Sequence, residues 1–202
     1  MRRAVSEEDK SHRREAILGA AKRVFAEKGY TATTIGDIAK VAGLSYGSIY
    51  WYFDSKDELF HSLMDSEERA LRTHIGEALA AITDEYAGQD LFRAAVRATF
   101  EFFEGDRAAV KLLFRDSNAL GERFQRHLFG LYEGFIDDIE AAIVLAQERR
   151  QIAAGPPRML AFSVAALVGQ IALRRLTNDD GLEAEAVADF VASLILDGLR
   201  PR

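Results

Sequence analysis

The chain contains no cysteine and only three prolines among its 202 residues. Without cysteine it can form neither disulfide bonds nor thiolate zinc sites, and its four histidines lack the close spacing that a histidine metal site requires. Two of the prolines are adjacent, at positions 156 and 157, so long stretches contain no residue that breaks a helix. These absences exclude a disulfide scaffold and predict a protein with no bound metal and no cofactor.

Long apolar runs and strand patterns are also missing. The most apolar segment, residues 159–173, has 15 residues and includes Gln170, whereas a membrane span needs about 20. The N-terminal "MRRAVSEEDKSHRRE" lacks the apolar run of a secretory signal. No alternating β-branched run lies between turn dipeptides. We therefore expect an all-α, soluble, cytoplasmic protein that does not associate with membranes.

Helical periodicity is present along most of the chain. Apolar residues recur at helical spacing from Ile17 to Phe25, and Gly29 follows as the expected C-terminal stop. Ser55 and Glu58 form a capping box at the start of a later helix. The segments "TDEYAGQD", "EGDR", "DSNALGE", "AAGPP" and "NDDG" read as breaks. Further helices are expected over 56–82, 89–104, 107–116, 120–149, 158–177 and 183–197, which gives about nine helices in all.

The net charge of −6 is unevenly distributed. Residues 1–56 contain 10 basic and 7 acidic residues, a net +3, whereas residues 57–202 contain 16 and 25, a net −9. A basic N-terminal unit on an acidic body fits a nucleic-acid-binding domain at 1–56 and a non-binding domain at 57–202.

The segment "TTIGDIAKVAGLSYGSIYWYFDSKDEL", residues 33–59, has the spacing of a helix-turn-helix. Ala39 allows a second helix to approach closely, Gly43 suits the left-handed turn, and Ser45 can cap the second helix. The apolar residues between Ile35 and Tyr52 then fall where two crossing helices bury them. This pattern predicts a DNA-binding head.

The second helix of this motif has an unusual outward face. When Ile49 is placed at the buried centre, Gly47 and Trp51 lie opposite, between Ser48 and Tyr50, while Tyr52 and Phe53 lie toward the core. Gly47 would let the backbone approach a groove floor, and Trp51 offers apolar contact to thymine methyl groups or sugars. Hydroxyls and one cation are the expected phosphate donors, from Thr33, Thr34, Ser48, Tyr50 and Lys56.

With its preceding passage "F-x-x-x-G-Y-x-x-T-T", this segment resembles the DNA-binding part of the TetR-type bacterial regulators. The resemblance is dense over residues 13–60 and implies a three-helix DNA-binding head, an all-α ligand-binding trunk and a homodimer on a palindromic double-stranded operator. It also implies repression relieved by a ligand. Tyr52 stands where these regulators often have histidine, and Tyr46 stands at a variable position. The implied DNA contacts are Thr34, Ser45, Tyr46, Gly47, Ser48, Tyr50, Trp51 and Lys56.

The two helices at the C-terminus suggest an interface between protomers. Small residues recur on the first of them and an apolar stripe runs along the second, so that two such pairs could form a four-helix interface around a two-fold axis. Burial within one protomer is the alternative. The expected interface residues are Ala161, Ala165, Gly169, Ala172, Val187, Val191, Leu194 and Ile195.

The middle of the chain is rich in phenylalanine, with polar residues interspersed. An aromatic stripe is often simply core, yet this combination also suits an elongated apolar pocket. The run "GDRAAVKLLFRDSNALGERFQ" resembles regulators that sense fatty acyl chains, often as CoA thioesters, which implies a small apolar ligand. The expected ligand contacts are Phe100, Phe103, Phe114, Phe124 and Phe135, with Arg97, Arg115 and His127 at the polar end.

Other protein classes fit less well. The sequence contains no GxSxG, P-loop, GxGxxG or paired-histidine motif that would indicate an enzyme, and we expect no enzymatic activity. An architectural DNA-binding protein would be far more basic. The alternative to a ligand-responsive regulator is an all-α enzyme or acyl-binding protein without sequence-specific DNA binding.

Overall fold

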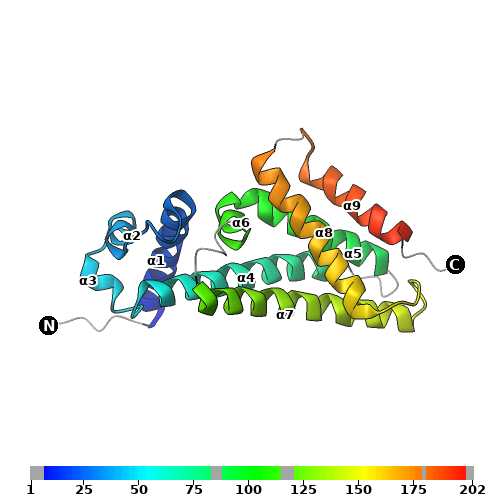
Figure 1. Ribbon diagram of the computed structural model, residues 1–202, viewed down its shortest axis with the longest axis horizontal. Coiled ribbons are helices and arrows are strands. Elements are labelled where there is room, and N and C mark those ends of the chain that lie inside the picture. Colours follow the sequence, from blue (N-terminus) through cyan, green and yellow to red (C-terminus); the bar gives the residue numbers. More distant parts are fainter. Residues whose placement is uncertain (1–6, 83–87, 115–120, 179–180, 199–202) are drawn as a thin grey trace. The chain divides into compact units, whose positions relative to one another are not determined.

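The computed structural model describes residues 7–82, 88–114, 121–178 and 181–198, which form helices joined by short connections (Figure 1). Within these ranges there is no strand, as expected from the sequence. The helices are α1 Glu7–Lys28, α2 Ile35–Ala42, α3 Tyr46–Ile49, α4 Lys56–Ala80, α5 Gly88–Gly105, α6 Arg107–Phe114, α7 Gly121–Glu148, α8 Pro157–Thr177 and α9 Ala184–Gly198.

Contacts divide the chain into two compact units. Unit 1 comprises Met1–Glu67 and Lys111–Leu128, and unit 2 comprises Glu68–Val110 and Phe129–Arg202. Three helices, α4, α6 and α7, contribute to both units because each continues past a boundary. The packing units therefore do not end at residue 56, where the sequence suggested a boundary between two functions.

α1 forms as its apolar spacing predicts. Ile17, Ala20, Ala21, Val24 and Phe25 are all buried. The helix ends at Lys28 and is followed by Gly29, which has φ 77° and donates its N–H to the carbonyl of Phe25 at 2.8 Å. Glycine is the residue that adopts this left-handed backbone conformation most readily, so the end of the helix is determined by the local sequence.

α2 and α3 are each fixed by their own end signals. Thr34 Oγ1 accepts a hydrogen bond from the Asp37 N–H, and the Asp37 carboxylate accepts one from the Thr34 N–H at 3.0 Å. Gly43 ends α2 at φ 67°, and Ser45 accepts the N–H of Ser48 at the start of α3. The predicted turn glycine and the predicted cap are both present, and the two helices form the helix-turn-helix.

At the start of α4 only half of the predicted capping box is present. Ser55 Oγ accepts the N–H of Glu58 at 3.0 Å, but the Glu58 carboxylate accepts from Asp54 N–H at 2.5 Å rather than from Ser55. The glutamate thus satisfies a donor one residue further out, which extends the cap by one residue.

In unit 2, α5 packs along α9 (Figure 1). Val96 and Phe100 of α5 and Val187 and Val191 of α9 are buried. α7 and α8 share a second apolar cluster of Ile136, Ile143 and Ala161.

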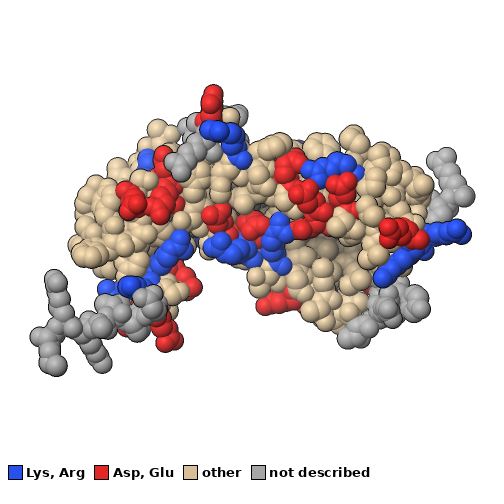
Figure 2. Space-filling view, turned by 90° about the horizontal axis from the view of Figure 1, so that it is seen from below, with Lys and Arg blue, Asp and Glu red and all other residues tan. Residues whose placement is uncertain are grey.

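Charged side chains lie mainly outside these cores. On the face drawn in Figure 2, basic and acidic side chains are interspersed along the helices. Within the described ranges, no helix combines the length and apolar character that a membrane crossing requires.

Candidate nucleic-acid interface

The outward face of α3 and the residues after it is aromatic and exposed. Trp51 has 88% of its surface exposed, Tyr46 58% and Tyr50 42%, whereas Ile49 is fully buried. A tryptophan so exposed buries almost none of its apolar surface within its own protomer, which is unusual for this residue type. The predicted orientation of this helix is confirmed: Phe53 lies in the core and Trp51 faces outward.

Tyr46 and Tyr50, one helical turn apart, form a pair on this face. Their hydroxyl oxygens lie 3.0 Å apart and their ring centroids 5.3 Å apart, with an angle of 58° between the planes. This hydrogen bond is the main cause that raises the pKa of the Tyr50 hydroxyl above its ordinary value. The Tyr50 hydroxyl therefore keeps its proton at neutral pH. Since one of the two hydroxyls donates to the other, one O–H of the pair remains to donate to a phosphate or base oxygen.

Gly47 lies between the two tyrosines along the chain, directly after Tyr46, and no contact within the described part of the protein requires a glycine there. A Cβ atom built at this position meets no atom within 4 Å, and the φ angle is not positive. Glycine in a helix costs stability relative to alanine, about 0.5–1 kcal/mol. The packing of the protein itself therefore does not account for a bare backbone at this position.

The hydroxyls at the helix starts are occupied by capping. Ser45 Oγ lies 2.7 Å from Ser48 Oγ, and Thr34 Oγ1 donates to the Asp37 carboxylate at 2.8 Å. Thr34 stands exposed at the first turn of α2, where the helix dipole and free N–H groups favour an anion. Its position, more than its hydroxyl, makes it a candidate phosphate contact.

Thr33 does not fit the predicted role. Its side chain is buried, and its hydroxyl donates to the carbonyl oxygen of Gly29 at 2.7 Å. The prediction of a phosphate contact from this hydroxyl is therefore not supported, because the group joins α2 to the end of α1 instead. An adjacent threonine pair does not reveal in sequence which hydroxyl points inward.

Lys56 has a structural role that the sequence did not indicate. Its ammonium group donates to the carbonyl oxygens of Tyr30 at 3.0 Å and Thr33 at 2.9 Å, and it lies 4.3 Å from the centroid of the Tyr30 ring. A lysine has three N–H donors. One therefore remains for a phosphate, on a side chain that is already held in place.

The residues predicted to contact a ligand fall into both packing units. Phe100 and Phe103 are buried on α5 and Phe135 lies on α7 under the guanidinium of Arg72, all in unit 2. Phe124 belongs to unit 1, where its ring packs 4.8 Å from that of Phe60. The side chain of Phe114 and the whole of Arg115 lie outside the described residues.

The two described candidates for the polar end have partners within the protein. Arg97 pairs with Glu185 at 2.7 Å and Asp189 at 3.3 Å, and so connects α5 to α9. His127 Nε2 lies 3.0 Å from the carboxylate of Asp65, and its ring packs edge-on against His61. Their predicted role at the polar end of a ligand stays a prediction, and it would require both groups to exchange these partners. Their partners lie 62 to 92 residues away in the sequence, so no local pattern could have shown them.

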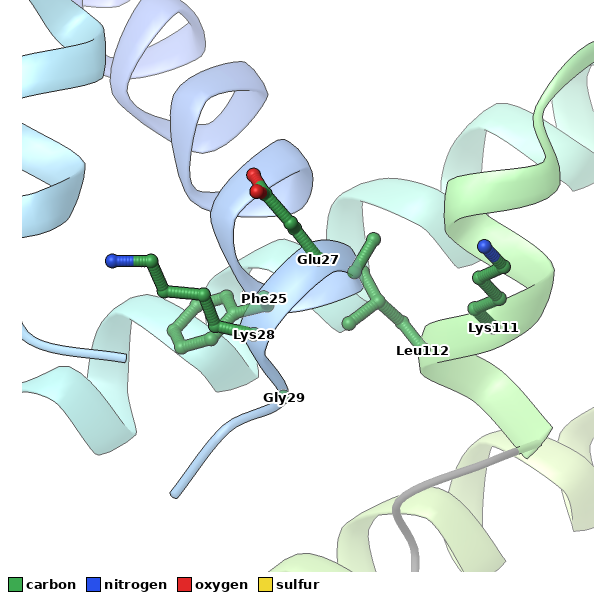
Figure 3. A pocket seen from close by; sticks show the side chains of 7 residues that line it. Phe25, Glu27, Lys28, Gly29, Lys111 and Leu112 are labelled. Atoms are coloured by element: carbon green, nitrogen blue, oxygen red, sulfur yellow. The ribbon is translucent and has the colours of Figure 1, made fainter. Parts of the chain in front are cut away.

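A small hollow in unit 1 lies between the end of α1 and α6 (Figure 3). It measures about 130 Å³ and is lined by Phe25, Ala26, Glu27, Lys28, Gly29, Lys111 and Leu112. Drug-sized ligands occupy about 300–1,000 Å³, and this lining is partly charged. The hollow is therefore too small and too polar for an acyl chain.

The predicted interface residues on α8 and α9 mostly face into their own protomer. Ala161, Ala172, Val187 and Val191 are buried, and Ala165, Gly169 and Ile195 are partly buried. Only Leu194 of this set is exposed. The prediction is wrong for the four buried residues, which have almost no surface left for a second copy: Ala161 packs against α7, and Val187 and Val191 are buried on α9, which packs along α5.

The apolar residues that α8 and α9 do expose are larger. Met159 and Phe162 on α8 and Phe190 and Leu194 on α9 each have 47% or more of their surface in solvent. We call these four residues the α8–α9 apolar face. Of these four, only Leu194 was among the interface residues expected from the sequence; Met159 and Phe162 gave no separate signal on a helix that is apolar nearly all round.

Known proteins share this architecture. The profile "Bacterial regulatory proteins, tetR family" matches residues 17–63. The chain is 30% identical over 196 residues to the HTH-type transcriptional repressor KstR2 of Rhodococcus jostii, covering 94% of this chain and 92% of the relative. It is 27% identical over 190 residues to the HTH-type transcriptional activator FasR of Mycolicibacterium smegmatis, covering 94% and 84%.

Among solved structures, the transcriptional regulator FadR of Bacillus subtilis, in complex with stearoyl-CoA, has the same fold. The TM-score is 0.80 at 19% identity, over 92% of this chain and 99% of that one. The helix-turn-helix match and the 30% identity along almost the whole length of a relative show that this chain is a DNA-binding transcriptional regulator of the tetR family.

Proposed function

We propose that this regulator binds a palindromic operator as a homodimer and represses transcription until an apolar, acyl-type ligand releases it from DNA. In this proposal residues 1–56 contact DNA, and residues 57–202 bind the ligand and form the dimer. The observation that carries it is the exposed aromatic face of α3, with Tyr46, Tyr50 and Trp51 around a bare Gly47. Such a face has no use in the core of its own protomer and fits a major groove.

Phosphate contacts are assigned to groups at helix starts. Two of the proposed donors are helix starts, the first turn of α2 at Thr34 and the capped start of α3 at Ser45 and Ser48. The other two are side-chain groups, the Tyr50 hydroxyl and the third N–H of Lys56. Contacts of this kind position a protein on DNA without reading its sequence. They suit an acidic protein, because capped helix ends and single cations replace a broad basic surface.

The dimer is assigned to the α8–α9 apolar face. This face consists of four large, exposed apolar side chains on two helices that are consecutive in the chain. In a dimer with a two-fold axis, the same four residues of a second copy would cover them. A two-fold dimer presents two α3 helices to half-sites about 34–36 Å apart. The operator is therefore expected to be a palindrome.

The ligand is assigned to unit 2, among Phe100, Phe103 and Phe135. The complex of Bacillus subtilis FadR with stearoyl-CoA supports an acyl thioester as the first candidate. A ligand can release DNA only if it binds the DNA-free arrangement of the dimer more tightly than the DNA-bound one. Since Arg97 pairs with Glu185 and Asp189, and His127 Nε2 lies 3.0 Å from the Asp65 carboxylate, the proposal places no polar group of the ligand on them.

The test uses purified protein and an operator recovered from a random duplex library. Trp51 is the only tryptophan, so its emission reports on the face of α3 alone. Saturating operator should quench or shift this emission, and stearoyl-CoA without DNA should change it little. Stearoyl-CoA should then release the operator at concentrations where free CoA does not.

Two results would contradict parts of the proposal. If stearoyl-CoA and free stearate both leave the operator complex intact, the acyl assignment fails while the regulator remains. Retention of stearoyl-CoA by a protein that enriches no DNA sequence would instead favour the acyl-binding alternative. Transcription in vitro from a promoter that overlaps the operator tests the sign, and repression is expected.

A further inference from the structure

The side chains of α3 and its flanks lack every group that pairs with two atoms of one base. From Ser45 to Trp51 the residues are Ser, Tyr, Gly, Ser, Ile, Tyr and Trp. Arginine and lysine read guanine, asparagine and glutamine read adenine, and acidic residues read cytosine, through paired or charged contacts in the major groove. None of these residue types stands in this segment, so α3 cannot use the commonest form of base recognition.

The segment instead presents two exposed aromatic rings beside an open backbone. Trp51 is 88% exposed, and the Tyr46 ring is 58% exposed. The Tyr46 ring nevertheless has two neighbours: the Tyr50 ring packs 5.3 Å away, and Gly36 of α2 lies close enough that a Cβ built on it would be 4.0 Å from the ring edge. Gly47, next to Tyr46 in the chain, adds no side chain to this surface, and a Cβ built there would meet no atom within 4 Å.

The major groove contains one apolar group among the four bases, the C5-methyl of thymine. A rigid aromatic surface without a bidentate donor is complementary to this methyl and to little else on the groove floor. We infer that Tyr46 and Trp51 determine operator specificity by apolar contact with thymine methyl groups. Tyr50 is a positioning residue that holds the Tyr46 ring. The inference rests on the proposed function of α3 as the recognition helix.

The cations nearest in sequence do not offer α3 an alternative reader. Lys56 Nζ is directed to the carbonyls of Tyr30 and Thr33, and Lys40 lies in the last turn of α2, before the turn glycine. Both lie outside α3. They are suited to phosphates, which carry no sequence information.

The experiment removes single methyl groups from DNA. Binding sites are selected from a random duplex library with the full-length protein, and each thymine of the recovered half-site is replaced in turn by deoxyuridine. This change deletes only the C5-methyl and keeps every hydrogen-bonding group. We expect a loss of about three- to fivefold at two or more positions, equivalent to about 0.7–1 kcal/mol at 1.4 kcal/mol per tenfold, as for one buried methyl group.

Variants connect each methyl to a side chain. Trp51→Ala should abolish the uracil penalty at one set of positions and Tyr46→Ala at another, whereas Tyr46→Phe, which keeps the ring, should retain it. Tyr50→Ala should reduce the penalty only at the positions assigned to Tyr46, which a general loss of stability would not do. Thr34→Ala serves as the control and should weaken binding to thymine and uracil operators equally.

Several outcomes would overturn the inference. If uracil at every thymine position leaves the operator affinity unchanged, α3 does not read methyl groups. The proposed function as an operator-binding regulator would not be affected by that result. A penalty that persists in both Tyr46→Ala and Trp51→Ala would assign the methyl contact to other residues. Recovery of no preferred sequence would remove the proposed function and this inference with it.

Discussion

The ammonium group of Lys56 lies 2.9 Å from the carbonyl oxygen of Thr33, 23 residues earlier in the chain. Together with the bond to Tyr30, this contact connects the start of α4 to the segment that precedes α2. A residue predicted as a plain phosphate donor is therefore also part of the frame that positions the helix-turn-helix.

Replacing this lysine should have two separable effects. Lys56→Met leaves two part-buried carbonyls without their charged donor and should lower the free energy of unfolding in urea by about 2 kcal/mol. If the third N–H contacts a phosphate, the slope of log K against log salt should also fall by about one. Arg149→Met, at an exposed position outside the proposed DNA-binding residues 1–56, is the control for charge alone. An unchanged salt slope in Lys56→Met would leave the lysine with its structural role only.

Gly47→Ala should separate stability from DNA binding. A Cβ at this position meets no atom within 4 Å. The substitution should therefore either leave the free energy of unfolding unchanged or raise it by up to about 1 kcal/mol. Operator affinity should fall tenfold or more if the groove floor approaches the bare backbone. Urea unfolding and an equilibrium binding titration on the same protein measure both. Full affinity in a stabilised variant would mean that DNA does not approach the backbone there.

Lys22 and Glu67 join α1 to α4 through a partly buried ion pair of 2.8 Å, with the Glu67 side chain 7% exposed. Lys22→Met should lower the free energy of unfolding by about 2 kcal/mol, because it leaves a carboxylate buried without its cation. Lys22→Met combined with Glu67→Leu should recover most of that loss. If the double variant loses as much free energy of unfolding as the Lys22→Met and Glu67→Leu variants lose together, the ion pair itself does not stabilise this contact.

Asp37 makes the stability of the helix-turn-helix depend on pH at the acid end. Hydrogen bonds from Lys28 and then from Thr34 hold the pKa of its carboxyl well below the ordinary value. A carboxyl whose pKa is lower in the folded state stabilises the fold above the ordinary aspartate pKa of about 3.9, and this contribution disappears as the pH falls toward the folded pKa.

The matched variant is Asp37→Asn. It should be less stable than the natural chain at pH 7, by the same margin down to about pH 5, and the difference should shrink below about pH 4. Urea titrations at stepped pH values measure this. A constant difference down to pH 2 would show that the ionised carboxyl is not the source of the stability.

The α8–α9 apolar face can be tested against the buried stripe beside it. Leu194 is 54% exposed, so Leu194→Arg should leave each protomer folded but dissociate the dimer, because a charge would be buried at the interface. Val191 is fully buried, and Val191→Arg should unfold the protomer instead. Sedimentation and circular dichroism distinguish the two. A Leu194→Arg protein that sediments as a dimer would place the interface elsewhere.

The helix layout was predictable because its signals are local. The apolar spacing from Ile17 to Phe25, the left-handed glycines at 29 and 43 and the cap at Ser45 each act within one or two helical turns, and the structure confirms all of them. The outward direction of Trp51 followed in the same way, since it depends only on helical rotation from a buried Ile49.

The tertiary structure alone decided which helix faces are covered and which polar groups meet. On α8, apolar nearly all round, no periodicity distinguishes the face of Ala161 from that of Phe162, and only packing against α7 buries the first and leaves the second exposed. The partners of Arg97 and Lys56 likewise come from distant segments. Local periodicity determines where a helix forms and how it turns, but burial and ion pairing depend on neighbours that the sequence places tens of residues away.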